Sequence, residues 1–106
     1  MDVKRVAELS AFRAEKMAKV SVFQTPRMFY DLYCLEPGQA QKVHAHAGSD
    51  KVYLVMEGRA IVTIGEEERV LGVGECVIAE AGIVHGVRAE ERAVCLVVTS
   101  PPPSKD

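Results

Sequence analysis

The chain has 106 residues, a formal net charge of −2 at pH 7 and a hydrophobic share of 48 %. This charge offers no basic field to a phosphate backbone, so we do not expect nucleic acid binding. No run reaches the ~18 apolar residues of a membrane span, and the first residues lack the apolar core of a secretory signal. We therefore predict a soluble, cytoplasmic protein without a membrane segment, in which residues 1–106 form one domain.

The chain changes character after its first 19 residues. Residues 1–19 are charged and weakly patterned, and either a short helical turn or an extended arm fits them. From residue 20 onward, short apolar runs alternate with Gly, Pro or charged clusters, which is typical of an all-β fold. The runs expected to be strands are 20–24, 28–35, 42–47, 52–56, 60–64, 69–71, 75–79, 86–89 and 93–99.

The proline-rich C-terminal segment predicts where the last strand ends. The segment 101–106 begins with consecutive prolines, which cannot donate ladder hydrogen bonds, so the sheet should end by Ser100. We expect an extended or disordered tail, or one that lies along a partner subunit. The core should therefore occupy residues 20–100, between an N-terminal arm and a proline-rich tail.

Two of the expected strands, 52–56 and 94–98, are apolar on both faces. A sheet with one face in water alternates apolar and polar residues instead. The simplest cover for the second apolar face is another copy of the chain. We therefore predict a homodimer.

The cysteines Cys34, Cys76 and Cys95 are odd in number, far apart and each set in an apolar run. No CxxC spacing is present. We expect three buried free thiols that behave as small apolar groups in a reducing compartment. The alternative is a single thiolate, best placed at Cys34, that serves as a soft metal ligand or a reactive group.

Histidine occurs at three positions, His44, His46 and His85. In a strand, residues two apart point to the same side, so His44 and His46 would project together with Cα atoms roughly 6–7 Å apart. Two such imidazoles can bind one metal ion at about 2.0–2.1 Å, and His85 remains for a third bond. Metal binding is the leading hypothesis; the alternative is three histidines that serve the core or the surface without a metal.

These histidines and the glycines around them resemble the two sequence motifs of the cupin superfamily. The first motif corresponds to Gly38, His44, His46 and Gly58, and the second to Gly74, Gly82 and His85. The resemblance extends over residues 28–100 and implies a double-stranded β-helix, a jelly-roll barrel with inward-pointing histidines near one mouth. It also implies one divalent transition metal per chain, as in three-histidine cupins, with iron, manganese, nickel, copper and zinc all open.

The sequence departs from the family pattern where cupins usually carry a glutamate ligand, because Lys51 stands there. Asp50 should point outward, since neighbouring strand residues face opposite sides, unless a bulge turns it. Lys51 has two interpretations. Its ammonium reaches solvent or pairs with a carboxylate such as Glu57, Glu80 or Glu36, or it points inward and helps to hold a carboxylate, a phosphate or an enolate.

Strand alternation places Tyr53 on the same face as Lys51, and with Tyr33 these side chains form the candidate pocket for a small molecule. One hypothesis is a metal-dependent enzyme, dioxygenase-like or isomerase-like, in which the ion acts as a Lewis acid. The other is a non-enzymatic module that binds or senses a small molecule in the same pocket. Sugar isomerase chemistry ranks lowest, and no catalytic residue is assigned.

Overall fold

The computed structural model describes residues 1–103. Over these residues the chain forms one 3-10 turn, η1 (Val6–Glu8), followed by β-strands. The strands are β1 (Ala18–Thr25), β2 (Met28–Leu35), β3 (Ala40–His44), β4 (Asp50–Glu57), β5 (Ala60–Ile64), β6 (Glu67–Leu71), β7 (Cys76–Ala79), β8 (His85–Arg88) and β9 (Ala93–Ser100). Each run expected from the sequence overlaps one of them, with ends that differ by a few residues.

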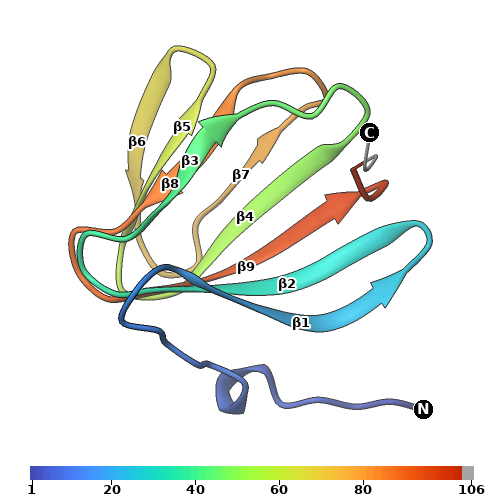
Figure 1. Cartoon of the computed structure of the whole chain (residues 1–106), viewed down its shortest axis with the longest axis vertical. Coiled ribbons are helices and arrows are strands. Elements are labelled where there is room, and N and C mark those ends of the chain that lie inside the picture. The colour runs from blue at the N-terminus through green and yellow to red at the C-terminus, as the bar shows by residue number, and fades with distance from the viewer. Residues whose placement is uncertain (104–106) are drawn as a thin grey trace.

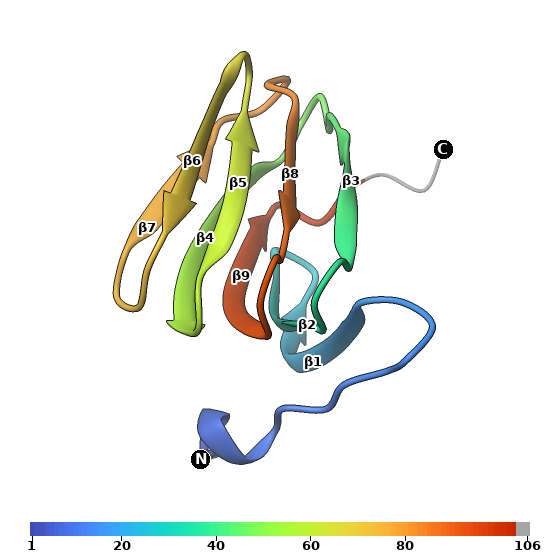
Figure 2. The same ribbon diagram turned by 90° about the vertical axis from the view of Figure 1, so that its left-hand side faces the viewer.

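The strands form two antiparallel sheets that face each other. One sheet has the order β1-β2-β9-β4-β7, and the other has the order β3-β8-β5-β6 (Figure 1). Figure 2 shows the four-stranded sheet in front of the five-stranded one. Strands that are neighbours within a sheet are often distant in sequence, as β2 and β9 are. This is the two-sheet jelly roll that the strand pattern and the family resemblance predict.

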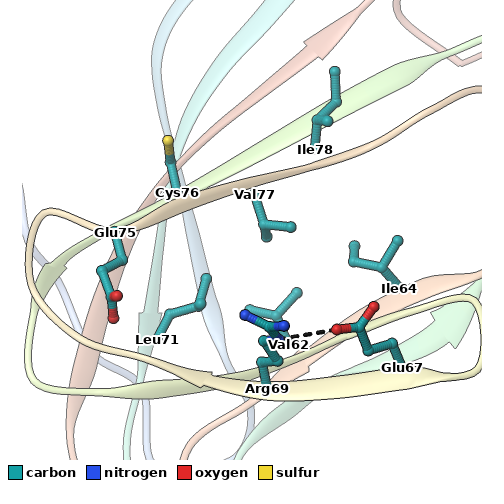
Figure 3. A pocket seen from close by; sticks show the side chains of 9 residues that line it. All are labelled: Val62, Ile64, Glu67, Arg69, Leu71, Glu75, Cys76, Val77 and Ile78. Carbon is teal, nitrogen blue, oxygen red and sulfur yellow. Dashed lines mark hydrogen bonds and ion pairs between the residues drawn. The ribbon is translucent and has the colours of Figure 1, made fainter.

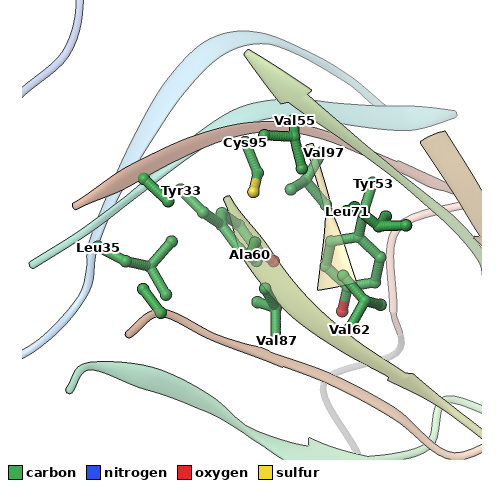
Figure 4. Close-up of a cluster of buried hydrophobic side chains, with 12 residues drawn as sticks. Tyr33, Leu35, Tyr53, Val55, Ala60, Val62, Leu71, Val87, Cys95 and Val97 are labelled. Carbon is green, nitrogen blue, oxygen red and sulfur yellow. The ribbon is translucent and has the colours of Figure 1, made fainter. Parts of the chain in front are cut away.

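The core fills the space between the sheets, and strand alternation decides which residues enter it. In β4, Lys51, Tyr53 and Val55 are buried, whereas Val52 and Leu54 are half-buried on the outer face. Figure 4 shows the cluster that results. Its labelled members are Tyr33, Leu35, Tyr53, Val55, Ala60, Val62, Leu71, Val87, Cys95 and Val97. Each large apolar side chain buried in this way contributes about 1.5–3 kcal/mol to folding.

The N-terminal arm combines a helical turn with extended chain, so both expected forms occur in it. Val6, Leu9 and Phe12 pack against a second cluster on the outer face of the five-stranded sheet. At the other end, β9 ends at Ser100, as predicted. The last part of the expected tail, residues 104–106, lies outside the described residues. Among residues 1–103, no helix is long and apolar enough to cross a membrane.

Two cysteines are buried as predicted, but the prediction for Cys76 is wrong. Cys34 and Cys95 are buried, whereas Cys76 is exposed. Cys76 begins the edge strand β7, where Val77 packs against the core and the side chain of Cys76 falls on the outer side. Burial raises the pKa of the Cys34 thiol and raises that of Cys95 to about 12. Both thiols are therefore protonated, which does not favour a reactive Cys34.

Candidate metal centre

The three histidines converge at one end of the barrel. His44 is the last residue of β3 and pairs directly with His85, the first residue of β8. Together with His46 they offer ligand atoms that all lie within 4.8 Å of one another. The ring centroid of His44 lies 4.5 Å from that of His85 and 4.7 Å from that of His46. The distant histidine thus joins the pair, as the sequence predicts.

His46 reaches this position from a loop, not from a strand as expected. β3 ends at His44, so His44 and His46 do not share a strand face. The carbonyl oxygen of His46 accepts a hydrogen bond of 2.9 Å from the N–H of Gly82, which precedes β8. This bond ties the loop after β3 to the loop before β8, and it holds His46 beside the other two rings.

Backbone carbonyls fix which nitrogen of two histidines carries the proton. His44 Nδ1 donates to the carbonyl oxygen of Lys42 at 2.7 Å, and His85 Nδ1 donates to that of Ile83 at 2.9 Å. A carbonyl oxygen can only accept, so in each neutral ring the proton lies on Nδ1 and the lone pair lies on Nε2. Such a bond from the second nitrogen is the usual support of a metal-binding histidine.

The Nε2 atom of His85 is a buried polar atom without a partner among the described residues. His85 as a whole is 1 % exposed. Leaving a buried acceptor unpaired costs about 1–3 kcal/mol, and a metal–nitrogen bond removes that cost. The geometry and the chemistry of these three side chains therefore fit a divalent transition metal with open coordination positions.

The surroundings also favour the neutral rings that a metal requires. Burial is the main reason why the pKa of His85 lies below its ordinary value of 6.5, and a hydrogen bond to Ile83 partly opposes it. The pKa of His46 is lowered by burial and then by the neighbouring His44 and Lys51. At neutral pH the rings of His46 and His85 are therefore uncharged, and a metal ion does not have to displace a proton to bind them.

Gly86 allows β3 to approach β8 closely enough for His44 to meet His85. A Cβ atom at this position would lie 3.0 Å from the carbonyl oxygen of Gln41 and 3.0 Å from Cα of Val43. The pairing of β3 with β8 also shifts register between Gln41 and His44. A side chain at Gly86 would therefore push away the strand segment that carries His44.

We expect Gly86→Ala to lower both stability and metal affinity. Forcing a methyl group against the backbone should destabilise the fold by about 1–3 kcal/mol, and displacing β3 should separate the ligands. Thermal unfolding and metal titration would measure the two effects. Gly48→Ala is the matched control, because a Cβ atom there meets nothing within 4 Å. Equal behaviour of the two variants would contradict this role for Gly86.

Lys51 points into the barrel, so the interpretation that placed its ammonium in solvent is wrong. The residue is 3 % exposed, and its Nζ donates a long hydrogen bond of 3.4 Å to Oε1 of Gln41. Nζ also lies 5.2 Å and 5.7 Å from the ring centroids of Tyr33 and Tyr53, within cation–π range. Asp50 points outward, where its Oδ1 accepts a hydrogen bond from the N–H of Ala81.

Gln41 connects the side chains of the candidate pocket, although no pattern in the sequence indicates this role. Its Oε1 accepts a hydrogen bond of 2.9 Å from the hydroxyl of Tyr53, in addition to that from Lys51. Its Nε2 donates to the hydroxyl oxygen of Tyr33 at 3.0 Å. The Tyr53 ring centroid lies 6.3 Å from that of His85, so this polar network adjoins the histidines.

The comparison with protein families agrees with this architecture. Residues 31–99, more than half of the chain, match the family model described as a cupin domain. The chain belongs to the cupin family. The family resemblance of the glycine and histidine motifs is thereby confirmed.

Three known proteins are similar to this cupin along almost their whole length. A protein of Thermus thermophilus with a crystal structure is 54 % identical, covers 97 % of this chain and 100 % of its own, and has a TM-score of 0.95. A Streptomyces coelicolor protein described as uncharacterised is 37 % identical over 94 % of this chain and 96 % of its own. A Klebsiella pneumoniae protein with a double-stranded β-helix domain is 23 % identical, covers 95 % of this chain and 90 % of its own, and has a TM-score of 0.85. The double-stranded β-helix is thus confirmed.

Two further charged residues of this cupin, Asp31 and Lys19, lie near Lys51. Asp31 is 8 % exposed, and burial raises the pKa of its carboxyl while the charges of Lys19 and Lys51 oppose that rise. Lys19 Nζ lies 5.3 Å from the ring centroid of Tyr33. Burial lowers the pKa of Lys51 to about 8, with the Lys19 charge acting in the same direction and Asp31 against it.

Among the clefts at the surface of the barrel, one borders a histidine. A cleft of about 420 Å³ is lined by the loop 45–49, which includes His46, and by the prolines 101–103. A second cleft, of about 390 Å³, lies between the edge strands β6 and β7 and is mostly apolar, with Glu67 and Arg69 paired at its rim (Figure 3). None of the three histidines lines this second cleft, whereas His46 lines the first, so the first cleft borders the candidate metal centre.

Proposed function

We propose that this cupin binds one divalent transition metal ion through His44, His46 and His85 and holds a small molecule at the open positions of that ion. The observation that carries the proposal is the buried, unpartnered Nε2 of His85, set among ligand atoms within 4.8 Å of one another. Three neutral imidazoles leave room for further ligands and suit iron, manganese, nickel, copper or zinc.

Such an ion supplies Lewis-acid chemistry toward an oxygen-bearing molecule. The chain's own part is to fix the imidazoles through backbone carbonyls and to keep the pocket closed with buried Tyr33 and Tyr53. We propose that the molecule is transformed there, in a dioxygenase-like or isomerase-like reaction. A non-enzymatic binding module would return the bound molecule unchanged, and mass spectrometry of the pocket's contents separates the two.

Elemental analysis tests the proposal directly. Protein purified without chelator and without nickel affinity resin should contain about one transition metal ion per chain, as expected for a single three-histidine site. A metal-free protein that also fails to take up added Zn²⁺, Mn²⁺, Fe²⁺, Ni²⁺ or Cu²⁺ would refute the metal site.

Acid should release the metal below pH 6.5. Because the pKa values of His46 and His85 are lowered, these rings stay neutral to lower pH than free histidine and gain a proton only as the pH falls further. A protonated imidazole cannot bind a metal, so the ion leaves in that range. Equilibrium dialysis between pH 4 and pH 8 measures the release. Release that begins above pH 7, or full retention at pH 4, would contradict the assignment.

We also propose that the chain forms a homodimer through the outer face of its five-stranded sheet. Val52 and Val98 are paired on this face beside the pair Leu54 and Leu96, and all four are half-buried in the single chain. Size-exclusion chromatography with light scattering should give twice the mass of one chain. Leu96→Lys should yield monomers, whereas Val70→Lys, at an exposed position on β6, should not. A monomeric unmodified protein would contradict the proposal.

The cysteines favour a cytoplasmic location for this cupin. Cys34, Cys76 and Cys95 are all free, and Cys76 is exposed. Free thiols persist in a reducing compartment and are oxidised outside it. We therefore propose that the protein works in the cytoplasm.

A further inference from the structure

We propose that the small molecule held by this cupin is a carboxylate, shared between the metal ion and the ammonium group of Lys51. This inference rests on the proposed metal site and adds the chemical class of the ligand. It is carried by three observations: the charges around Lys51, the hydrogen-bond donors left without acceptors, and the lack of a hydrogen bond between Lys51 and the described histidines.

The charges of the pocket call for an anion. A divalent ion held by three neutral imidazoles would keep its full charge, and the inward-pointing ammonium of Lys51 adds a further positive charge. Within residues 1–103, no carboxylate oxygen lies within 4.0 Å of Lys51 Nζ. Asp31, the nearby acid, is buried and has its own charge disfavoured. A buried charge is costly unless it is paired, so a bound anion would stabilise the site.

The hydrogen bonds of the pocket leave donors without acceptors. Gln41 uses its oxygen to accept from Tyr53 and Lys51, and its amide nitrogen donates to the oxygen of Tyr33. Among the described residues, the hydroxyl hydrogen of Tyr33 and two of the three ammonium hydrogens of Lys51 have no acceptor. Carboxylate oxygens are pure acceptors, so this class of ligand satisfies these groups, whereas a neutral alcohol brings donors of its own.

Lys51 does not take the place of the metal. A lysine that replaced the ion would donate its hydrogens to the free imidazole nitrogens. Instead Lys51 Nζ bonds to Gln41, and Nε2 of His85 has no partner within the described chain. With an ion bound at the histidines, two separate cations would face a ligand, the metal ion and the Lys51 ammonium. A carboxylate has two oxygens and can bind both at once.

The ammonium group of Lys51 is held in place before any ligand binds. The rings of Tyr33 and Tyr53 lie within cation–π distance of Lys51 Nζ, and both tyrosines are at most 1 % exposed. A cation in such apolar surroundings attracts an anion more strongly than one in water does. The cleft of about 420 Å³ beside His46 lies at the edge of the histidine cluster, where a small molecule would approach.

Acetate binding to the cobalt-loaded protein tests the inference. The unmodified protein, Lys51→Met, Lys51→Arg and the control Lys16→Met are loaded with Co²⁺, and metal analysis confirms the content of each. Each is titrated with sodium acetate at constant ionic strength while the visible absorption of Co²⁺ is followed. Methionine matches the length of lysine without its charge, and Lys16 is exposed, so all four proteins should fold.

We expect Lys51→Met to bind acetate at least about tenfold more weakly than the unmodified protein and Lys16→Met, and Lys51→Arg to retain part of the affinity. Neutral acetamide should bind the unmodified protein much more weakly than acetate. Equal acetate affinity with and without Lys51, or equal affinity for acetate and acetamide, would overturn the inference. Failure of the unmodified protein to take up Co²⁺ would instead refute the metal site, so the two failures are distinguishable.

Discussion

His46→Ala should remove most of the bound metal while leaving the barrel folded. Removing a group that merely supports a ligand already weakens metal binding by about 10–100-fold, and removing the ligand itself should cost at least as much. His46 is half-buried and lies in a loop, so its loss should change the free energy of unfolding by only about 0.5 kcal/mol. Metal analysis after dialysis and thermal unfolding of the apo-protein measure the two quantities.

Lys42→Ala is the control for this variant, because Lys42 is exposed in β3, just before the loop that carries His46, and supports His44 through its backbone carbonyl alone. It should keep a full complement of metal. If His46→Ala still holds one ion per chain with unchanged affinity, the three histidines are not the metal site.

Lys51→Glu should tighten metal binding. The side chain at this position points into the barrel, and a carboxylate there would supply the fourth ligand that the sequence lacks. It would also replace a repulsive charge by an attractive one. We expect the dissociation constant for Zn²⁺ to fall by about tenfold or more, which corresponds to about 1.4 kcal/mol or more. Competition with a chromogenic chelator measures it.

Asp50→Glu controls for an added methylene in an acidic side chain that points outward. It should leave metal affinity unchanged. The Lys51→Glu variant should at the same time lose acetate binding, because the position that attracts an anion now repels it. Unchanged metal affinity in Lys51→Glu would show that this side chain does not face the ion.

The inward-facing residues of β4 could be predicted because strand alternation holds there. Lys51, Tyr53 and Val55 share one face in a regular strand, and all three are buried. The same rule applied to β2 pairs Asp31 with Tyr33, so an acidic residue inside an apolar run was a usable signal for a polar pocket. The motif resemblance also predicted that His85 joins the other two histidines, although His46 arrives from a loop and not from the expected strand.

Gln41 could not be predicted, because it depends on an irregularity in β3. Residues three apart in a regular strand face opposite sides, so Gln41 and His44 would not both point inward. The shift of register between them brings both side chains into the barrel. No residue pattern announces such a bulge, which arises from the fit of β3 against Gly86 on β8. The prediction for Cys76 was wrong for a related reason, since sequence does not show that β7 is an edge strand.

The carbonyl oxygens of Lys42 and Ile83 have a consequence for metal selection. They hold the imidazoles of His44 and His85 in one orientation and one tautomer before any ion binds. The protein therefore offers the same two nitrogen atoms to every metal ion. Two nitrogen ligands held in this way do not rearrange to reject a competing ion, so the intrinsic preference of the proposed site would follow the general order of divalent ions, with copper above nickel and iron above manganese. On the proposed metal site, the ion that this cupin carries would therefore depend on which ion the cell makes available, and protein produced in a different medium should carry a different one.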